Sequence, residues 1–219
     1  MSYRALDDID NKIISAVQYI GAREGAQNAT AKKVATMCDI SDFAVFAHFG
    51  TKKGYLDAAR DEFYQKYLNR MKDLEAENAS LEQTWDTLLD DFIQQPDGAI
   101  YYSSYISTFG IDEEYQKRRI SDFLPNARRL LASEGLDDDN LVLIWDHMVN
   151  LILYYTSAFA KGKLVNNERT RELIKCTAFR GLEGHGITGY TGENVSHSMN
   201  DKMTSIYTGF NNESPYGKS

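Results

Sequence analysis

Apolar residues recur every three or four positions over most of this chain of 219 residues. That spacing places them on one face of a helix, whereas a strand facing a core would alternate at every second residue. Pro occurs only 3 times, so few points interrupt such helices. The pattern predicts helices over 10–23, 31–38, 42–49, 52 to beyond 70, 81–95, 99–109, 112 onward, 141–160 and 167–182.

The turns between these helices follow from Pro, Gly and capping residues. We expect Pro96 to Gly98 to end the helix over 81–95, and Pro125 to kink or divide the helix that begins at Asp112. The chain is therefore predicted to be all-α. An N-terminal three-helix unit would be followed by an antiparallel helical bundle.

Residues 30–56 are the most informative segment. Thr30, Ser41 and Thr51 each stand where a side-chain oxygen would cap the next helix. Asp39 and Ile40 form the short turn between the first two of these helices. Two short helices joined by such a turn indicate a helix-turn-helix, whose second helix is available for the major groove of DNA.

This segment resembles the N-terminal domain of the TetR family of transcriptional regulators. Many positions at fixed spacing match the family pattern: Thr30, Val34, Ala35, Ile40, Ser41, Val45, His48, Phe49, Thr51, Lys52 and Leu56. The resemblance implies a homodimer that binds palindromic operator DNA, most simply as a repressor, and is released by a small-molecule effector. It covers residues 10–60 by motif, and the rest of the chain only by helix order and length.

The chain departs from the family pattern on its recognition helix. Asp39 stands where the family has Gly at positive φ, a region that Asp tolerates better than most residues. Phe46 replaces the family Tyr, while Phe43 and Ala44 replace a small residue or Pro and a Thr. The hydrogen-bonding groups left on this helix are mainly Asp42 and His48.

The resemblance and the residue chemistry together give the candidate DNA contacts: Thr30, Lys32, Asp42, Phe43, Ala44, Phe46, His48 and Lys52. Lys52 is favoured as a phosphate contact because a cation is mildly unfavourable at a helix N-terminus unless it has such a use. His48 could contact a phosphate or pack beside Phe49. Asp42 could accept a bond from cytosine, although an acid in the first turn needs no function.

Charge and cysteine content bound the cellular setting. The formal net charge is −8, but residues 1–60 hold 8 basic against 7 acidic residues, so the excess of acid lies in the remainder. We therefore expect a few lysines at specific positions, rather than a broad basic surface, to supply the phosphate contacts. The polar N-terminus does not resemble a signal peptide, and Asp146, His147 and Asn150 interrupt the 141–160 segment as a membrane span. Two distant cysteines fit a cytoplasmic protein.

Aromatic residues in the second half of the helical region are the candidates for an effector cavity. Such a cavity is mostly apolar with a few hydroxyl groups, although aromatics at helical spacing often belong simply to the core. The candidates are Trp85, Tyr102, Tyr105, Phe109, Phe123 and Tyr154. An anionic effector could use the basic residues near 117–129, which otherwise form a solvated face paired with acids.

The 141–160 helix is apolar on two sides, Val142, Val149 and Leu153 forming the second side. Such a helix needs two burial surfaces. We therefore expect a homodimer through helices near 137–163 and 167–182. The expected domains are 1–50 for DNA binding, 51–183 for effector binding and dimerisation, and a polar Gly/Ser/Asn-rich tail over 184–219.

No residue set supports an enzyme, a metal site or a cofactor. Asp146 and His147 are adjacent and do not share a helix face. His185 lies in a Glu-Gly-His-Gly sequence that lacks the second His of a zinc-protease helix. The competing hypothesis is a TetR-like fold that has lost specific DNA readout and acts as a protein-interaction co-regulator, which Phe43, Ala44, Phe46 and the weak positive charge favour.

Overall fold

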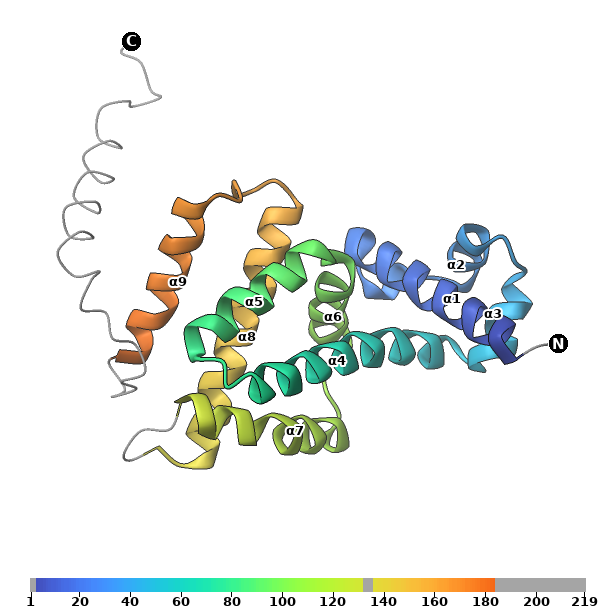
Figure 1. Cartoon of the computed structure of the whole chain (residues 1–219). Helices are drawn as coiled ribbons and strands as arrows, with labels where there is room; N and C mark the ends of the chain where they lie inside the picture. Colours follow the sequence, from blue (N-terminus) through green and yellow to red (C-terminus); the bar gives the residue numbers. More distant parts are fainter. Residues whose placement is uncertain (1–2, 132–135, 184–219) are drawn as a thin grey trace, which may run out of the picture.

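The computed structural model describes residues 3–131 and 136–183, which form α-helices and one short 3-10 turn without any strand (Figure 1). The predicted tail over 184–219, with His185, lies outside the described residues. The elements are α1 (Tyr3–Glu24), η1 (Ala26–Asn28), α2 (Ala31–Cys38), α3 (Asp42–Phe49), α4 (Lys52–Ala76), α5 (Leu81–Gln94), α6 (Pro96–Phe109), α7 (Glu113–Leu131), α8 (Asp138–Ala160) and α9 (Glu168–Glu183).

The molecule has two ends joined by α4 (Figure 1). Helices α1, α2 and α3 lie at one end with the start of α4, and we call this part the head. The long α4 runs from the head to the other end, where it meets α5 to α9, which we call the body. The all-α prediction, with three helices before the long connecting helix, is therefore confirmed.

Local sequence signals explain where most helices begin. Ser80 and Gln83 form a reciprocal capping box at the start of α5. The side chain of Asp137 accepts a hydrogen bond from Asn140 N at 2.9 Å before α8, and Asn167 accepts one from Thr170 N at 2.9 Å before α9. Each cap satisfies a backbone N–H group that has no partner within the helix.

The hydrophobic core of the head includes residues from outside the head. Its buried residues come from α1, η1, α2, α3 and the first turns of α4, and Tyr101 and Tyr105 of α6 are buried in the same cluster. Tyr101 packs against Gly21 of α1, and its hydroxyl donates a hydrogen bond to Leu56 O at 2.8 Å. The boundary expected at residue 50 stays a prediction, but the head's core draws on residues as distant as Tyr105.

Polar bonds also join head and body. Buried Gln18 of α1 donates from Nε2 to Ala59 O at 2.9 Å and to Glu62 Oε2 at 2.8 Å. On the other side, Ser104 Oγ of α6 accepts a hydrogen bond from Ala26 N in η1 at 2.9 Å. The head is therefore fixed to α4 through one face of α1 and to α6 through η1.

The expectation for Pro96 was right about the helix before it, since α5 ends at Gln94, but Pro96 to Gly98 form the first turn of α6 and not a separate stop. Proline's fixed φ and missing N–H are both acceptable at a first helical position. Pro125 does not divide α7, which continues from Glu113 to Leu131. Pro125 is exposed, and buried residues on both sides of it, including Phe123 and Ala127, hold the helix against the core.

The second apolar side predicted for α8 is wrong in its residues, and the outward side of the helix also carries exposed His147 and Asn150. Leu153, expected on that second side, is buried with the main core, and Val142 and Val149 are partly buried. The apolar residues that face outward are Leu143 and Tyr154, with 68% and 65% of their surface exposed. Residues one or two positions apart in the sequence lie on different sides of a helix. Periodicity alone does not decide which of these sides is buried.

The contact of Gly21 with Tyr101 gives a test of how the head is held. A Cβ atom on Gly21 would lie 2.8 Å from Tyr101 Cε2 and still nearer Cδ2. We expect Gly21→Ala to lower the free energy of unfolding by about 1–3 kcal/mol, since overpacking forces buried groups apart. Urea denaturation measures this, with Asn11→Ala on the exposed side of α1 as the control. Equal stability of the two variants would contradict the packing described.

Candidate nucleic-acid interface and effector cavity

Three side-chain caps build the helix-turn-helix. Thr30, Ser41 and Thr51 each accept a hydrogen bond from the backbone N–H three residues later, at 3.4, 3.1 and 3.0 Å. These caps begin α2, α3 and α4, as the sequence predicted. Thr30 thus has a structural role, and its contact with DNA stays a prediction.

The turn between α2 and α3 depends on Asp39. This residue adopts φ 55° and ψ 47°, the left-handed region expected for its position. Ile40 N then donates to Ala35 O at 3.0 Å, which closes the end of α2. Asp therefore replaces the family's Gly without changing the path of the chain.

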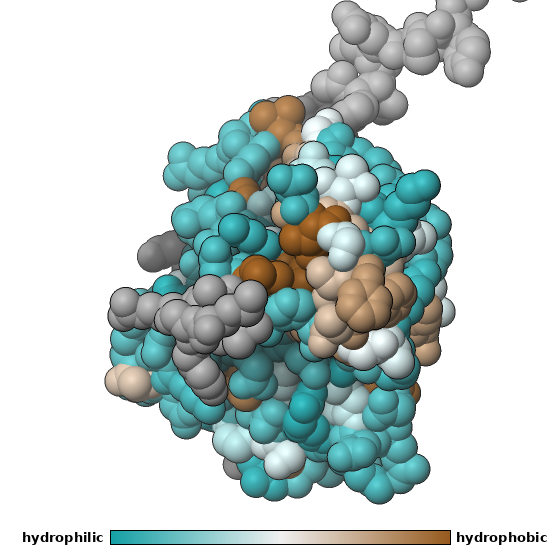
Figure 2. Space-filling model, turned by 90° about the vertical axis from the view of Figure 1, so that its right-hand side faces the viewer, coloured by the Kyte–Doolittle hydropathy of each residue, from teal (hydrophilic) through white to brown (hydrophobic). Residues whose placement is uncertain are grey.

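The outward side of α3 is largely apolar. Phe43 is 80% exposed and Phe46 is 40% exposed, while Ala44 is half-buried and Val45 is buried in the head. The ring of Phe46 leans toward Tyr55, with ring centroids 6.4 Å apart. Figure 2 looks onto this end of the molecule and shows apolar side chains near the middle of the face, with hydrophilic residues around them.

The two polar residues of α3 differ in their exposure to solvent. His48 is mostly buried, and its Nδ1 lies 2.6 Å from Asp10 Oδ1 of α1. Asp10 therefore holds His48 against the head, a pairing that sequence reasoning missed because the two residues are 38 positions apart. Asp42, in the first turn of α3, is exposed.

Four lysines stand on the N-terminal turns of α2 and α4, on either side of α3 in sequence. Lys33 pairs with Glu24, and Lys53 lies 2.5 Å from Asp57. Exposed Lys32 makes no ion pair with any described residue. Lys52 Nζ donates to Gln27 O of η1 at 2.8 Å, a neutral acceptor that leaves its charge unpaired.

A cavity of about 380 Å³ lies among α6, α7 and α8. Tyr102 and Ile106 form part of its wall, and Arg119 and Asp146 meet there at 2.5 Å. Burial raises the pKa of the Asp146 carboxyl above its ordinary value, although the Arg119 guanidinium acts to lower it. The cavity thus offers apolar surface together with one charged pair.

No protein-family model and no curated protein matches this sequence. Solved structures do match the fold. A TetR family transcription regulator from Marinobacter aquaeolei VT8 gives a TM-score of 0.65 at 16% identity over 81% of this chain and 97% of that chain. A TetR-family transcriptional regulator from Haemophilus influenzae RD gives 0.57 at 19% identity, again over 81% and 97%.

The chain has the TetR-family fold. NalD of Pseudomonas aeruginosa, the secondary repressor of the MexAB-OprM multidrug efflux pump, also shares this fold, with a TM-score of 0.51 at 16% identity. It matches over 80% of this chain and 95% of that chain. The agreement extends beyond the motif-bearing residues 10–60 and includes the body.

The predicted effector residues are distributed through this TetR-like fold rather than gathered. Tyr102 lines the cavity among α6, α7 and α8, and Phe123 lies beside a small void next to it. Trp85 is buried against Phe179 in the core, and Tyr105 belongs to the head cluster. Phe109 and Tyr154 are exposed.

Most basic residues of α7 form ion pairs with acidic residues, as expected for a solvated or structural helix face. Lys117 pairs with Glu113 at 2.5 Å, Arg118 with Asp61 at 3.3 Å and Arg128 with Asp138 at 2.5 Å. Of this group, Arg119 is the residue that reaches the cavity. An anionic effector would therefore have to compete with Asp146 for it.

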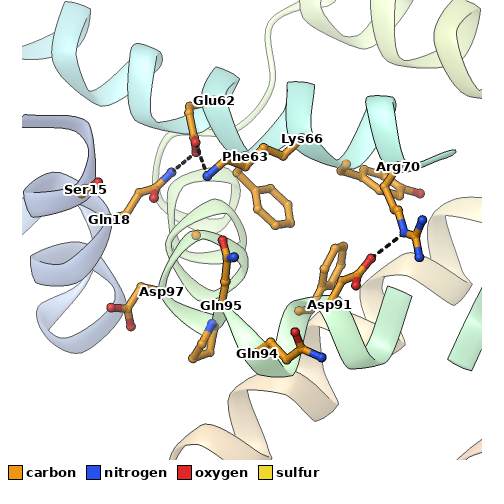
Figure 3. A pocket seen from close by; sticks show the side chains of 14 residues that line it. Ser15, Gln18, Glu62, Phe63, Lys66, Arg70, Asp91, Gln94, Gln95 and Asp97 are labelled. Atoms are coloured by element: carbon orange, nitrogen blue, oxygen red, sulfur yellow. Dashed lines mark hydrogen bonds and ion pairs between the residues drawn. The ribbon is translucent and has the colours of Figure 1, made fainter. Parts of the chain in front are cut away.

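A second hollow lies where head and body meet (Figure 3). This open cleft of about 480 Å³ is walled by α1, α4, α5 and the start of α6. Its charged side chains are paired with one another: Glu62 meets Lys66 at 2.5 Å, and Arg70 meets Asp91 at 2.8 Å. The second pair crosses from α4 to α5, whereas Glu62 and Lys66 both lie on α4. Asp97, also at the cleft, pairs with Arg23 at 2.9 Å, so these side chains leave no charge free for a ligand.

Within the described residues, no helix is long and apolar enough to cross a membrane, and no cluster of His, Cys, Asp and Glu could hold a metal ion.

The Arg119–Asp146 pair gives a pH-dependent test of the cavity wall. Arg119→Ala leaves a partly buried carboxylate alone, which should cost about 1–3 kcal/mol of stability at pH 7. The pKa of Asp146 rises further in this variant, so the folded state holds the proton more tightly than the unfolded chain does. Stability is then lost as the pH rises through the folded pKa, and the deficit should shrink on acidification.

Urea denaturation of wild type and variant, at about pH 7 and about pH 4.5, measures the deficit. Asp146→Asn added to Arg119→Ala should remove its pH dependence. A deficit of the same size at both pH values would show that Asp146 does not carry the effect.

Proposed function

We propose that the protein is a cytoplasmic transcription regulator that binds DNA as a homodimer, most simply as a repressor. The observation that carries this proposal is the capped helix-turn-helix, whose α3 carries exposed side chains and lies in the chain between two helices that have lysines in their first turns. Backbone N–H groups and lysines at such termini are suited to hold phosphates while the second helix enters the major groove.

The outward side of α8 supports the homodimer. Leu143 and Tyr154 are exposed on it, and neither would gain from contact with water. A two-fold axis beside this helix would bury the same surface twice. It would also set two α3 helices at a fixed spacing for the half-sites of a palindrome.

A small molecule in the cavity among α6, α7 and α8 would act on the heads through α6. Tyr102 of α6 lines that cavity, and the adjacent Tyr101, on another side of the helix, packs on Gly21 of α1. A ligand that binds one position of α6 more tightly than another would shift the population between two head arrangements. The apolar wall with its Arg119–Asp146 pair fits a ligand with an apolar body and hydrogen-bonding groups.

A second function, a protein-interaction co-regulator, is favoured by the exposed Phe43 and by the absence of Arg, Asn and Gln from α3. It differs from the first in one measurable respect. It requires no sequence preference among DNA duplexes.

Selection from random duplexes by the purified protein tests the regulator. We expect an enriched palindrome, because two equivalent heads read two equivalent half-sites. Lys52→Ala should weaken binding to all sequences alike and reduce the slope of log affinity against log salt by about 1 per head. Fluorescence anisotropy at several salt concentrations measures both effects.

Lys72→Ala is the matched control, since Lys72 is an exposed lysine near the far end of α4. It should leave the salt slope unchanged. Absence of enrichment, with weak binding that Lys52→Ala and Lys72→Ala affect equally, would exclude the regulator for the homodimer and favour the co-regulator.

The dimer surface is tested by Leu143→Glu. A charge buried in an apolar interface should raise the dimer dissociation constant roughly 30-fold or more, while the exposed position leaves the monomer folded. Sedimentation equilibrium gives the mass. Ser121→Glu, on the exposed side of α7, adds the same charge elsewhere and should leave the dimer intact. Loss of dimer in neither or in both variants would count against α8 as the interface.

A further inference from the structure

The outward side of the recognition helix carries an apolar stripe, formed by Phe43, Phe46 and Ala47. Residues at these spacings share one helix face. Phe43 is in the first turn and 80% exposed, so it projects farthest from the head. We call this set the α3 stripe.

Hydrogen-bond readout by the side chains of α3 is almost absent. His48 is held against the head by Asp10, and the remaining polar side chain of the helix, Asp42, is an acceptor with a charge that phosphates repel. Helix α3 has no Arg, Lys, Asn or Gln, the residues that recognise guanine or adenine by paired bonds. Helix α3 would therefore distinguish one base from another mainly by apolar contact.

One base offers an apolar group in the major groove, and it is thymine through its 5-methyl group. Contact between phenylalanine or alanine and that methyl is an established mode of base recognition. The N-terminal residues of a recognition helix are the ones that reach base edges, which is where Phe43 stands.

We infer that the α3 stripe reads thymine methyl groups, with Phe43 as the residue that fixes specificity. This rests on the proposed regulator function. The operator half-site is then expected to hold thymine at the positions facing the start of α3.

Charge around the stripe favours a duplex over a protein partner. Lys32 and Lys52 stand on the flanking helix N-termini, and neither is paired with an acid among the described residues. Unpaired cations on the helices before and after α3 in the chain are suited to hold phosphates of the backbone that borders a major groove. A single eight-residue helix is also small beside the roughly 800 Å² per partner of a stable protein interface.

The experiment compares the duplex enriched by selection with copies in which deoxyuridine replaces thymidine. This change removes the methyl group and keeps every hydrogen-bonding group of the pair. We expect wild type to bind the uracil copy roughly fourfold more weakly for each methyl buried, or about 15-fold when one is lost from each half-site. The ratio should stay constant as salt rises, because apolar contact releases no counterions.

Phe43→Ala should bring the thymine-to-uracil ratio close to 1. Because Phe43 is exposed, the variant should fold, which its thermal unfolding verifies. Val165→Ala removes another exposed apolar side chain, in the loop after α8, and should keep the wild-type ratio.

Equal affinity of wild type for the thymine and uracil copies of a tightly bound duplex overturns the inference and leaves the regulator standing. A ratio that Phe43→Ala does not reduce also overturns it, as does a selected half-site without thymine. Failure to bind any duplex above background removes the regulator function itself, and the stripe is then a surface for protein.

Discussion

Tyr101 is the residue on which the arrangement of head and body depends. Its ring is buried against Gly21 of α1, and its hydroxyl is bonded to Leu56 O of α4 at 2.8 Å. Burial raises the pKa of this hydroxyl, so it remains a neutral donor at any physiological pH. One side chain of α6 thereby fills the core of the head and satisfies a carbonyl there. The head has no separate core that would let it move independently of α6.

Charge is divided unevenly along the chain. Several acidic residues of the body pair with arginines, such as Asp91 with Arg70 of α4 and Asp146 with Arg119 of α7. These pairs hold helices to one another. Residues 1–60 hold 8 basic against 7 acidic residues, so the net charge of −8 is not concentrated at the head. In the proposed regulator, the lysines near α3 would need to attract phosphates only at short range. In the proposed regulator, the positions of these lysines, rather than the total charge of the chain, would favour binding to DNA.

Local features of the fold could be predicted from the sequence, and distant ones could not. Thr30, Ser41 and Thr51 were recognisable as caps, and Asp39 as the left-handed turn, because capping and turn chemistry act within four residues. The bond between Asp10 and His48 spans 38 positions and has no local signal. For the same reason, aromatic residues at helical spacing could not be divided into core and cavity before the helices were placed against one another.

Lys52 rests on the carbonyl of Gln27, in a turn that is itself fastened to α6 through Ala26 N and Ser104 Oγ. A phosphate that takes this ammonium group must displace a neutral carbonyl, which is a weaker acceptor than an ion. The exchange therefore favours DNA without requiring an ion pair to break. Because η1 is bonded to α6, the position of the Lys52 ammonium group also depends on the position of α6. In the proposed regulator, the contact of Lys52 with the DNA backbone would thus be connected to the position of α6 over two hydrogen bonds, independently of any rotation of the head.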